Sequence, residues 1–134
     1  MPERSVAEEM ARRSEPDALF RNLAPFDLES LLYDWRLWRR PKPATPPGDW
    51  GFWLILVGRG FGKTRTGAEW VREQVEAGTA KHIALVGATA GDVRDTMIEG
   101  ESGLLGVFPP GDRPRYEPSK RRVTFHNGAM ATAF

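Results

Sequence analysis

A glycine-rich loop that ends in a lysine and a threonine is the part of this sequence most able to do chemistry. The loop and the residue after it read Gly58-Arg59-Gly60-Phe61-Gly62-Lys63-Thr64-Arg65. Backbone N–H groups of such a loop, freed by glycines that accept unusual φ values, can form a concave site for anionic oxygens. A helix that begins at the loop adds the positive end of its dipole. The pattern therefore predicts a site for the phosphates of a nucleoside triphosphate.

Two side chains of the loop have separate expected roles. Lys63 would reach the β- and γ-phosphates, and the Thr64 hydroxyl would ligate Mg²⁺. The spacing is a variant, because the common phosphate-binding pattern has a glycine where Val57 stands, and the first glycine here is Gly58. A glycine-rich surface turn with an extended lysine is the alternative interpretation.

The residues on both sides of the loop predict the elements that would position it. Phe52–Val57 is apolar almost throughout and is expected to be a strand with both faces covered. From about Lys63 to Ala77, apolar residues recur at helical spacing on one face, while Arg65, Glu69, Arg72 and Glu76 recur on the other. Strand, loop and helix are the context that a phosphate-binding loop requires.

The second half of the sequence continues the alternation of strands and helices. Ile83–Val86 is expected to be a strand, Gly91–Ile98 a helix and Pro109–Pro118 a loop. Arg122–Phe125 and Ala129–Phe134, joined across Asn127-Gly128, are expected to form a hairpin. The order of elements predicts an α/β fold, a P-loop NTPase-type parallel sheet with flanking helices, and the chain would carry an incomplete version of it.

Residues 1–47 have a different character and predict a short helical arm with a proline-rich connector. Helical patterns run from Ser5 to about Arg13 and from a possible N-cap at Asp27. Pro41–Gly48 contains four prolines and cannot continue a helix, so it predicts an extended connector. Residues 48–134 would then be the N-terminal portion of a P-loop ATPase domain.

Composition excludes several classes of protein. The chain has 134 residues, a formal net charge of +1 and no cysteine, which excludes a disulfide framework and a thiolate metal site. No apolar run reaches membrane-spanning length, and the N-terminus has no signal-peptide core. We expect a cytoplasmic protein with no membrane partner.

Several motifs, in order along the chain, resemble the large terminase subunit of tailed bacteriophages and of phage-like gene-transfer particles. They are Leu37–Pro41, Pro47–Trp50, Gly58–Trp70, Gly87–Thr89, Glu99–Leu105 and Tyr116–Arg122. The resemblance implies an ATP-driven motor that packages double-stranded DNA into capsids, with ATP and Mg²⁺ as cofactors. It also implies a homo-oligomeric ring that binds the portal and the small terminase subunit, and a host-cytoplasmic location.

The resemblance also implies residue roles. Gly58–Thr64 matches the Walker A loop of the family, so that Lys63 and Arg59 would take part in catalysis, with Arg59 sensing the γ-phosphate or a neighbouring subunit. Arg59 as a solvated loop residue is the alternative. Gly87–Thr89 resembles a segment that contacts DNA in helicase-like motors, and a turn with Thr89 as an N-cap is the alternative. Two basic groups, Lys120–Arg122 and the set Arg36, Arg39 and Arg40, could meet DNA phosphates or be solvated faces.

Two expected features of the family are not found in this sequence. The only glutamine is Gln74, so the sequence does not predict adenine specificity. No apolar run ends in the Asp-Glu pair of a Walker B strand, in which Asp holds Mg²⁺ and Glu positions water. We therefore expect about half of an ATPase domain, continued by further apolar and acidic residues. A small P-loop nucleotide-binding enzyme such as a kinase, and an inert truncated fragment, stay open as alternatives.

Overall fold

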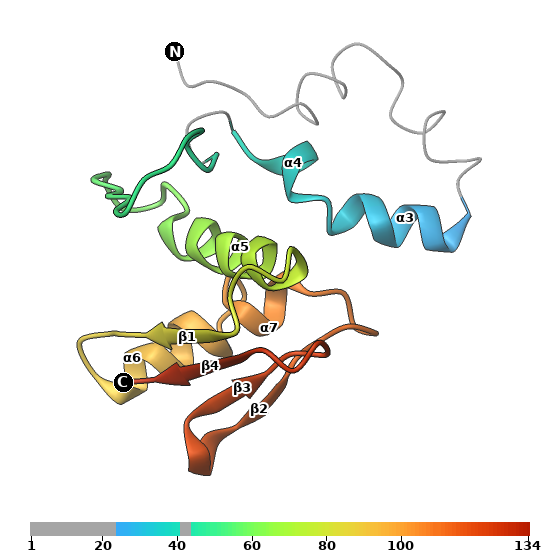
Figure 1. Ribbon diagram of the computed structural model, residues 1–134. Coiled ribbons are helices and arrows are strands. Elements are labelled where there is room, and N and C mark those ends of the chain that lie inside the picture. The colour runs from blue at the N-terminus through green and yellow to red at the C-terminus, as the bar shows by residue number, and fades with distance from the viewer. Residues whose placement is uncertain (1–23, 41–43) are drawn as a thin grey trace. The chain divides into compact units, whose positions relative to one another are not determined.

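The computed structural model describes residues 24–40 and 44–134 (Figure 1). The chain divides into two compact units, Met1–Leu54 and Ile55–Phe134, and each is considered by itself. The helix expected over residues 5–13 and the first residues of the connector, 41–43, lie outside the described residues.

The described part of the first unit contains two short helices, α3 (Pro25–Leu32) and α4 (Trp35–Trp38). The prediction that Asp27 caps a helix is wrong, because α3 begins two residues earlier with Ala24 as its N-cap. Proline has a fixed φ and no N–H, which suits the first helical position and explains the start at Pro25. Asp34 caps α4, and its carboxylate accepts a hydrogen bond of 2.9 Å from the backbone N–H of Arg36.

The long helix of the second unit is α5 (Lys63–Glu76), and the prediction of this helix is confirmed. Its buried positions include Ala68, Val71 and Val75, which share one face at helical spacing. The helix ends at Ala77, and Gly78 follows with a φ of 71°. Burial of the apolar face against α7 (Leu104–Val107) fixes the orientation of α5 within this unit (Figure 1).

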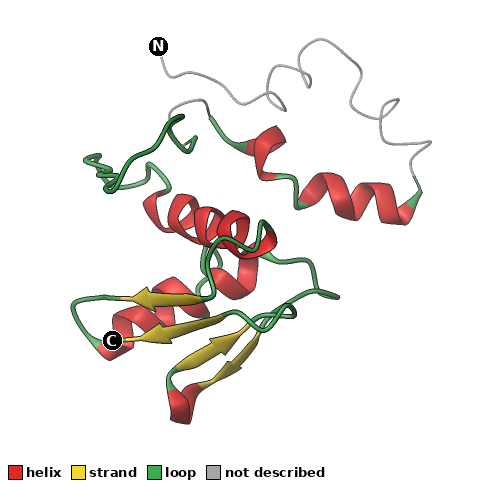
Figure 2. Ribbon diagram, in the orientation of Figure 1, coloured by secondary structure: helices red, strands yellow, loops and turns green. Residues whose placement is uncertain are grey.

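Four strands form one mixed sheet, in the order β1-β4-β3-β2 (Figure 2). They are β1 (His82–Leu85), β2 (Arg115–Glu117), β3 (Arg122–Thr124) and β4 (Met130–Ala133). The pair β1–β4 is parallel, whereas β3–β4 and β2–β3 are antiparallel. The α/β class is confirmed, and the pair β1–β4 is parallel as expected. The sheet as a whole is mixed and not parallel, because the short connections from β2 to β3 and from β3 to β4 allow only antiparallel pairing. A fold of the P-loop NTPase type stays a prediction.

The predicted strand Phe52–Val57 is not formed, and this prediction is wrong. Its side chains include Phe52, Leu54 and Leu56, which are 97%, 76% and 81% exposed. A strand needs a neighbour that pairs with its backbone N–H and C=O groups, and among the described residues none pairs with this segment. An apolar run alone therefore did not suffice to form a strand.

Between the strands lie short helical segments. Residues expected to form one helix, Gly91–Ile98, are divided between α6 (Ala90–Asp92) and η1 (Val93–Ile98), a π-helix. Helix α7 has no counterpart among the predicted elements, and β2 lies in Pro109–Pro118, which was predicted to be a loop. A single turn of 3-10 helix, η2 (Pro118–Lys120), joins β2 to β3. The predicted hairpin is confirmed, with β3 and β4 as its strands.

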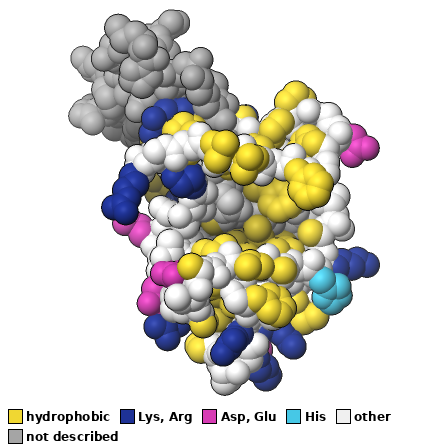
Figure 3. All heavy atoms as spheres, turned by 90° about the vertical axis from the view of Figure 1, so that its left-hand side faces the viewer, with side chains coloured by type: hydrophobic (Ala, Val, Ile, Leu, Met, Phe, Trp, Pro, Cys, Tyr) yellow, Lys and Arg dark blue, Asp and Glu magenta, His cyan; other side chains and the backbone are white. Residues whose placement is uncertain are grey.

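The core of the second unit lies among α5, η1, α7 and the sheet. Phe108, which follows α7, is 1% exposed, and its ring lies 5.7 Å from that of Phe125, which follows β3. Other hydrophobic side chains are open to solvent, as Figure 3 shows for one face. No helix in the described parts of the chain is long and apolar enough to cross a membrane.

Candidate functional site

The glycine-rich loop, Gly58–Thr64, forms a turn that leads directly into α5. Two of its glycines have positive φ values, 77° at Gly60 and 93° at Gly62. Residues with a Cβ rarely adopt this conformation, so the loop needs glycine at both positions. Gly62 is the N-cap of α5, and it has no side chain that could occupy the space in front of the first turn.

The ammonium group of Lys63 lies against the backbone of the loop. It donates hydrogen bonds to the carbonyl oxygens of Gly58, at 2.8 Å, and of Val57, at 3.0 Å. A lysine ammonium has three N–H donors, so one donor is left beyond these two bonds. The lysine thus closes the loop at its base and retains the capacity to bind an anion.

The first turn of α5 adds backbone donors to the site. The first intrahelical bond runs from the N–H of Thr66 to the carbonyl of Gly62, at 2.9 Å, so the N–H groups of Lys63 and Thr64 precede the helical ladder. The Thr66 hydroxyl donates to the same carbonyl at 2.9 Å. N–H groups in front of the ladder, together with the helix dipole, favour an anion at this end of the helix.

A cavity of about 490 Å³ opens beside the loop and the start of α5. It is lined by six of the predicted site residues, Arg59, Gly60, Gly62, Lys63, Thr64 and Arg65. The other two predicted residues, Gly58 and Phe61, are not among the described residues that line it. Gly58 instead contributes the carbonyl oxygen that holds Lys63. The volume lies in the range of small-molecule sites.

The other residues that line the cavity have no predicted site role. They come from η1 and from the turn that follows it, and they are Asp95, Thr96, Gly100, Glu101 and Ser102. The sequence feature that could have indicated them is the motif Glu99–Leu105, which contributes to the family resemblance but has no predicted role at the site. Its position at the same cavity as the glycine-rich loop could not be predicted without the packing of α7 against α5.

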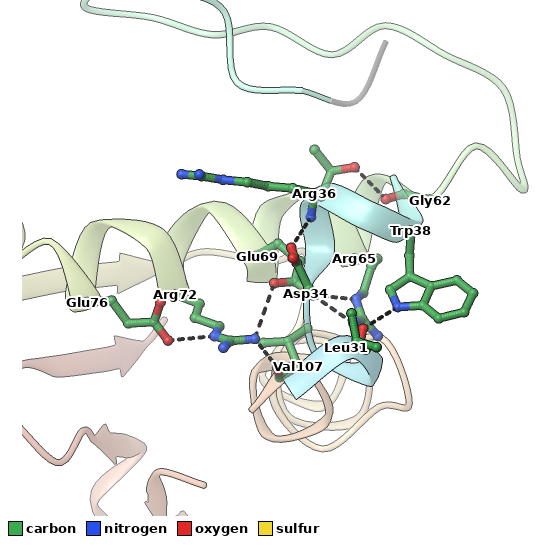
Figure 4. Close-up of polar contacts among 11 residues, drawn as sticks. Leu31, Asp34, Arg36, Trp38, Gly62, Arg65, Glu69, Arg72, Glu76 and Val107 are labelled. Atoms are coloured by element: carbon green, nitrogen blue, oxygen red, sulfur yellow. Dashed lines mark hydrogen bonds and ion pairs between the residues drawn. The ribbon is translucent and has the colours of Figure 1, made fainter. Parts of the chain in front are cut away.

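A buried carboxylate, Glu69, holds one of the cavity-lining arginines (Figure 4). Glu69 is 4% exposed, and its Oε1 lies 2.8 Å from Nε and 2.7 Å from an Nη atom of Arg65. Arg72 lies 3.9 Å from the other carboxylate oxygen and donates to the carbonyl of Val107 at 2.9 Å. Burial raises the pKa of Glu69 above its usual value, and the two arginines counteract part of that effect. The charged residues that recur along α5 therefore form ion pairs, one of them beside the cavity, and Glu69 is buried although it lies on the charged face.

The segment Gly87–Thr89 ends at a helix N-terminus. The backbone N–H of Asp92 donates to the Thr89 hydroxyl at 3.1 Å, and the hydroxyl donates to the Asp92 carboxylate at 2.8 Å. This geometry confirms the interpretation of Thr89 as an N-cap, here of α6. Contact of this segment with DNA stays a prediction.

The cavity has the features that a metal-bound polyphosphate requires. One wall provides the cationic side chains Arg59, Lys63 and Arg65, backbone donors and a helix N-terminus. Thr64 lines the same cavity, and a hydroxyl oxygen is a ligand that Mg²⁺ accepts. In the described residues, no three His, Asp or Glu side chains gather into a metal cluster. Mg²⁺ commonly binds through few protein ligands together with phosphate oxygens and water, so this site fits such an ion.

Comparison with known proteins identifies one family. The model of the family described as "Terminase large subunit, T4likevirus-type, N-terminal" matches residues 54–134, more than half of the chain. No curated protein and no solved structure matches. The matched range contains the glycine-rich loop, α5 and both walls of the cavity. The chain belongs to this family of large terminase subunits.

Proposed function

We propose that this chain, as a member of the large terminase family, is the ATP-binding part of a motor that packages double-stranded DNA into capsids. The glycine-rich loop is the phosphate-binding loop of that motor. The observation that carries the proposal is the cavity at the start of α5, where Lys63, Thr64 and two positive-φ glycines meet on one wall. The family match supports the same role.

In this proposal each side chain of the loop has a separate task. Lys63 binds the β- and γ-phosphates with the donor left beyond its bonds to Val57 and Gly58. The Thr64 hydroxyl ligates Mg²⁺, which neutralises charge that develops on the phosphates during transfer. Arg59 lies at the same cavity and stabilises the γ-phosphate, so Arg59 and Lys63 form the catalytic pair of this segment.

The partners of the proposed motor follow from the family. We infer double-stranded DNA as its substrate, a homo-oligomeric ring as its assembly, and the portal and the small terminase subunit as its protein partners. Packaging of this kind takes place in the cytoplasm of a bacterial host. Among the basic runs, Lys120 already pairs with Glu117 at 2.9 Å, so we assign DNA contact to no particular residue.

Equilibrium titration of Mg–ATP by calorimetry tests the nucleotide site. Lys63→Ala should weaken binding by about tenfold to a hundredfold, since a charge-assisted hydrogen bond contributes ~1.5–3 kcal/mol. Lys81→Ala is the matched control, because Lys81 is exposed, precedes β1 and does not line the cavity. Equal affinity of wild type and Lys63→Ala, or equal losses in both variants, would contradict the proposal.

A further inference from the structure

The cavity lining that comes from η1 and the turn after it has no part in the proposed function so far. Asp95 and Thr96 come from η1, and Glu101 and Ser102 come from the turn between η1 and α7. A π-helix is rare and less favourable than an α-helix, and it often occurs at functional sites. Here the hydrogen bond from the N–H of Glu99 to the carbonyl of Arg94, at 2.8 Å, has the spacing of a π-helix and leads into the turn.

Close backbone packing fixes the turn in place. A Cβ at Gly106 would overlap the carbonyl oxygen of Glu101, and a Cβ at Gly103 would lie 2.8 Å from the carbonyl oxygen of Ile98. The next residue, Leu104, is 1% exposed and anchors the turn in the core. Glu101 is therefore an exposed side chain on a backbone that is held by buried neighbours.

The two carboxylates of this wall differ in how their charge is compensated. Asp95 pairs with Arg94 at 2.6 Å, and this hydrogen bond lowers the pKa of Asp95. None of the ion pairs found in the described parts of the chain involves Glu101. Glu101 thus brings an uncompensated negative charge to a cavity that Arg59, Lys63 and Arg65 also line.

A carboxylate at this place affects free and metal-bound triphosphate in opposite ways. It repels the phosphate oxygens of a free triphosphate. A bound Mg²⁺ neutralises part of the negative charge of the triphosphate. It also keeps several water molecules, and a carboxylate can accept hydrogen bonds from them. The same side chain therefore disfavours the free ligand and favours the metal complex.

We propose that Glu101 is a specificity residue that selects the Mg²⁺-bound form of a nucleoside triphosphate over the metal-free form. The inference rests on the proposed function, because it requires a triphosphate at the glycine-rich loop. Ser102 has a hydroxyl at the same wall and can donate to a phosphate oxygen. Glu101 acts on binding, and we assign it no part in the transfer step.

The experiment compares ATP affinities by calorimetry in excess Mg²⁺ and in excess EDTA. Glu101→Gln should weaken binding of Mg–ATP by about threefold to fivefold and strengthen binding of metal-free ATP by a similar factor, as expected for one exposed charge interaction. Glu101→Lys should shift the preference further toward the metal-free form. Asp112→Asn is the matched control, because it removes the same charge from an exposed residue that does not line the cavity.

Opposite signs of the two changes distinguish this role from a purely structural one, which would move both affinities in the same direction. If wild type binds ATP in a Lys63-dependent manner and the ratio of the two affinities is unchanged in Glu101→Gln and Glu101→Lys, Glu101 has no such role and the proposed function stands. If wild type binds neither form of ATP, both the inference and the proposed function are wrong.

Discussion

The segment before the glycine-rich loop is more apolar than the helix after it, yet only the helix is built into a core. Phe52–Val57 contains no charged side chain and only one polar group, the indole N–H of Trp53, but Phe52 and Leu56 are more than 80% exposed. In contrast, α5 contains many charged residues, and its Val75 is fully buried. The difference shows that burial depends on the partner against which an element packs, and that apolar composition alone does not produce it.

Removal of an aromatic ring should give the largest difference between the two regions. Phe108→Ala deletes a ring that is 1% exposed and packs against Phe125 and under Arg72, whose guanidinium lies 5.4 Å from the ring centre. We expect a loss of about 3–5 kcal/mol in the free energy of unfolding. Phe52→Ala, at a ring that is 97% exposed, should change it by less than about 0.5 kcal/mol.

Urea unfolding, followed by circular dichroism, measures both values. Similar losses in the two variants would show that Phe52 is buried in solution and would remove the contrast between the two sides of the loop.

Two glycine substitutions, only a few residues apart, should change the free energy of unfolding by smaller amounts and in opposite directions. Gly62 has a φ of 93°, so Gly62→Ala should destabilise the protein by roughly 1–2 kcal/mol. Gly67 lies in the interior of α5 with open space around its Cβ position, so Gly67→Ala should stabilise it by up to about 1 kcal/mol. Thermal unfolding of both variants gives the two signs. A stabilising Gly62→Ala would mean that the loop does not keep this backbone conformation.

The pH dependence of stability should reveal the burial of Glu69. Because the pKa of Glu69 is raised in the folded protein, ionisation of this group is less favourable there than in the unfolded chain. The contribution of Glu69 to stability is therefore present at pH values below its unfolded pKa and is lost as the pH rises through its folded pKa. Relative to Glu69→Gln, wild type should lose stability over that window, by at most ~1.4 kcal/mol per pH unit. A difference that grows in the other direction would mean that Arg65 and Arg72 outweigh the effect of burial.

Residue patterns predicted the local features of this protein and missed those that depend on distant contacts. Helix α5, the hairpin of β3 and β4, and the loop with its glycines follow from spacing within a short segment. The parallel pairing of β4 with β1 joins residues 130–133 to residues 82–85, and no local signal encodes it. The predicted strand Phe52–Val57 is not formed for the same reason, because apolar composition does not specify a pairing strand.

The candidate site divides in the same way. The wall that contains Lys63 and Thr64 could be predicted because one motif specifies both the loop and the helix. The wall that contains Glu101 could not, since it reaches the cavity through the π-helical geometry of η1 and the packing of α7 on α5. The packing of α7 on α5 joins residues 104–107 to residues 63–76, and the residue pattern of η1 predicted an α-helix and not a π-helix.

Hydrogen–deuterium exchange with and without saturating Mg–ATP tests the central claim most directly, because it reports on both sides of the loop at once. We predict that the ligand slows exchange of the backbone amides from Gly60 to Thr66, that Lys63→Ala abolishes this protection, and that Phe52–Val57 stays in fast exchange. Unchanged exchange from Gly60 to Thr66 in wild type, or protection that survives Lys63→Ala, would contradict the assignment of this loop as the phosphate-binding site.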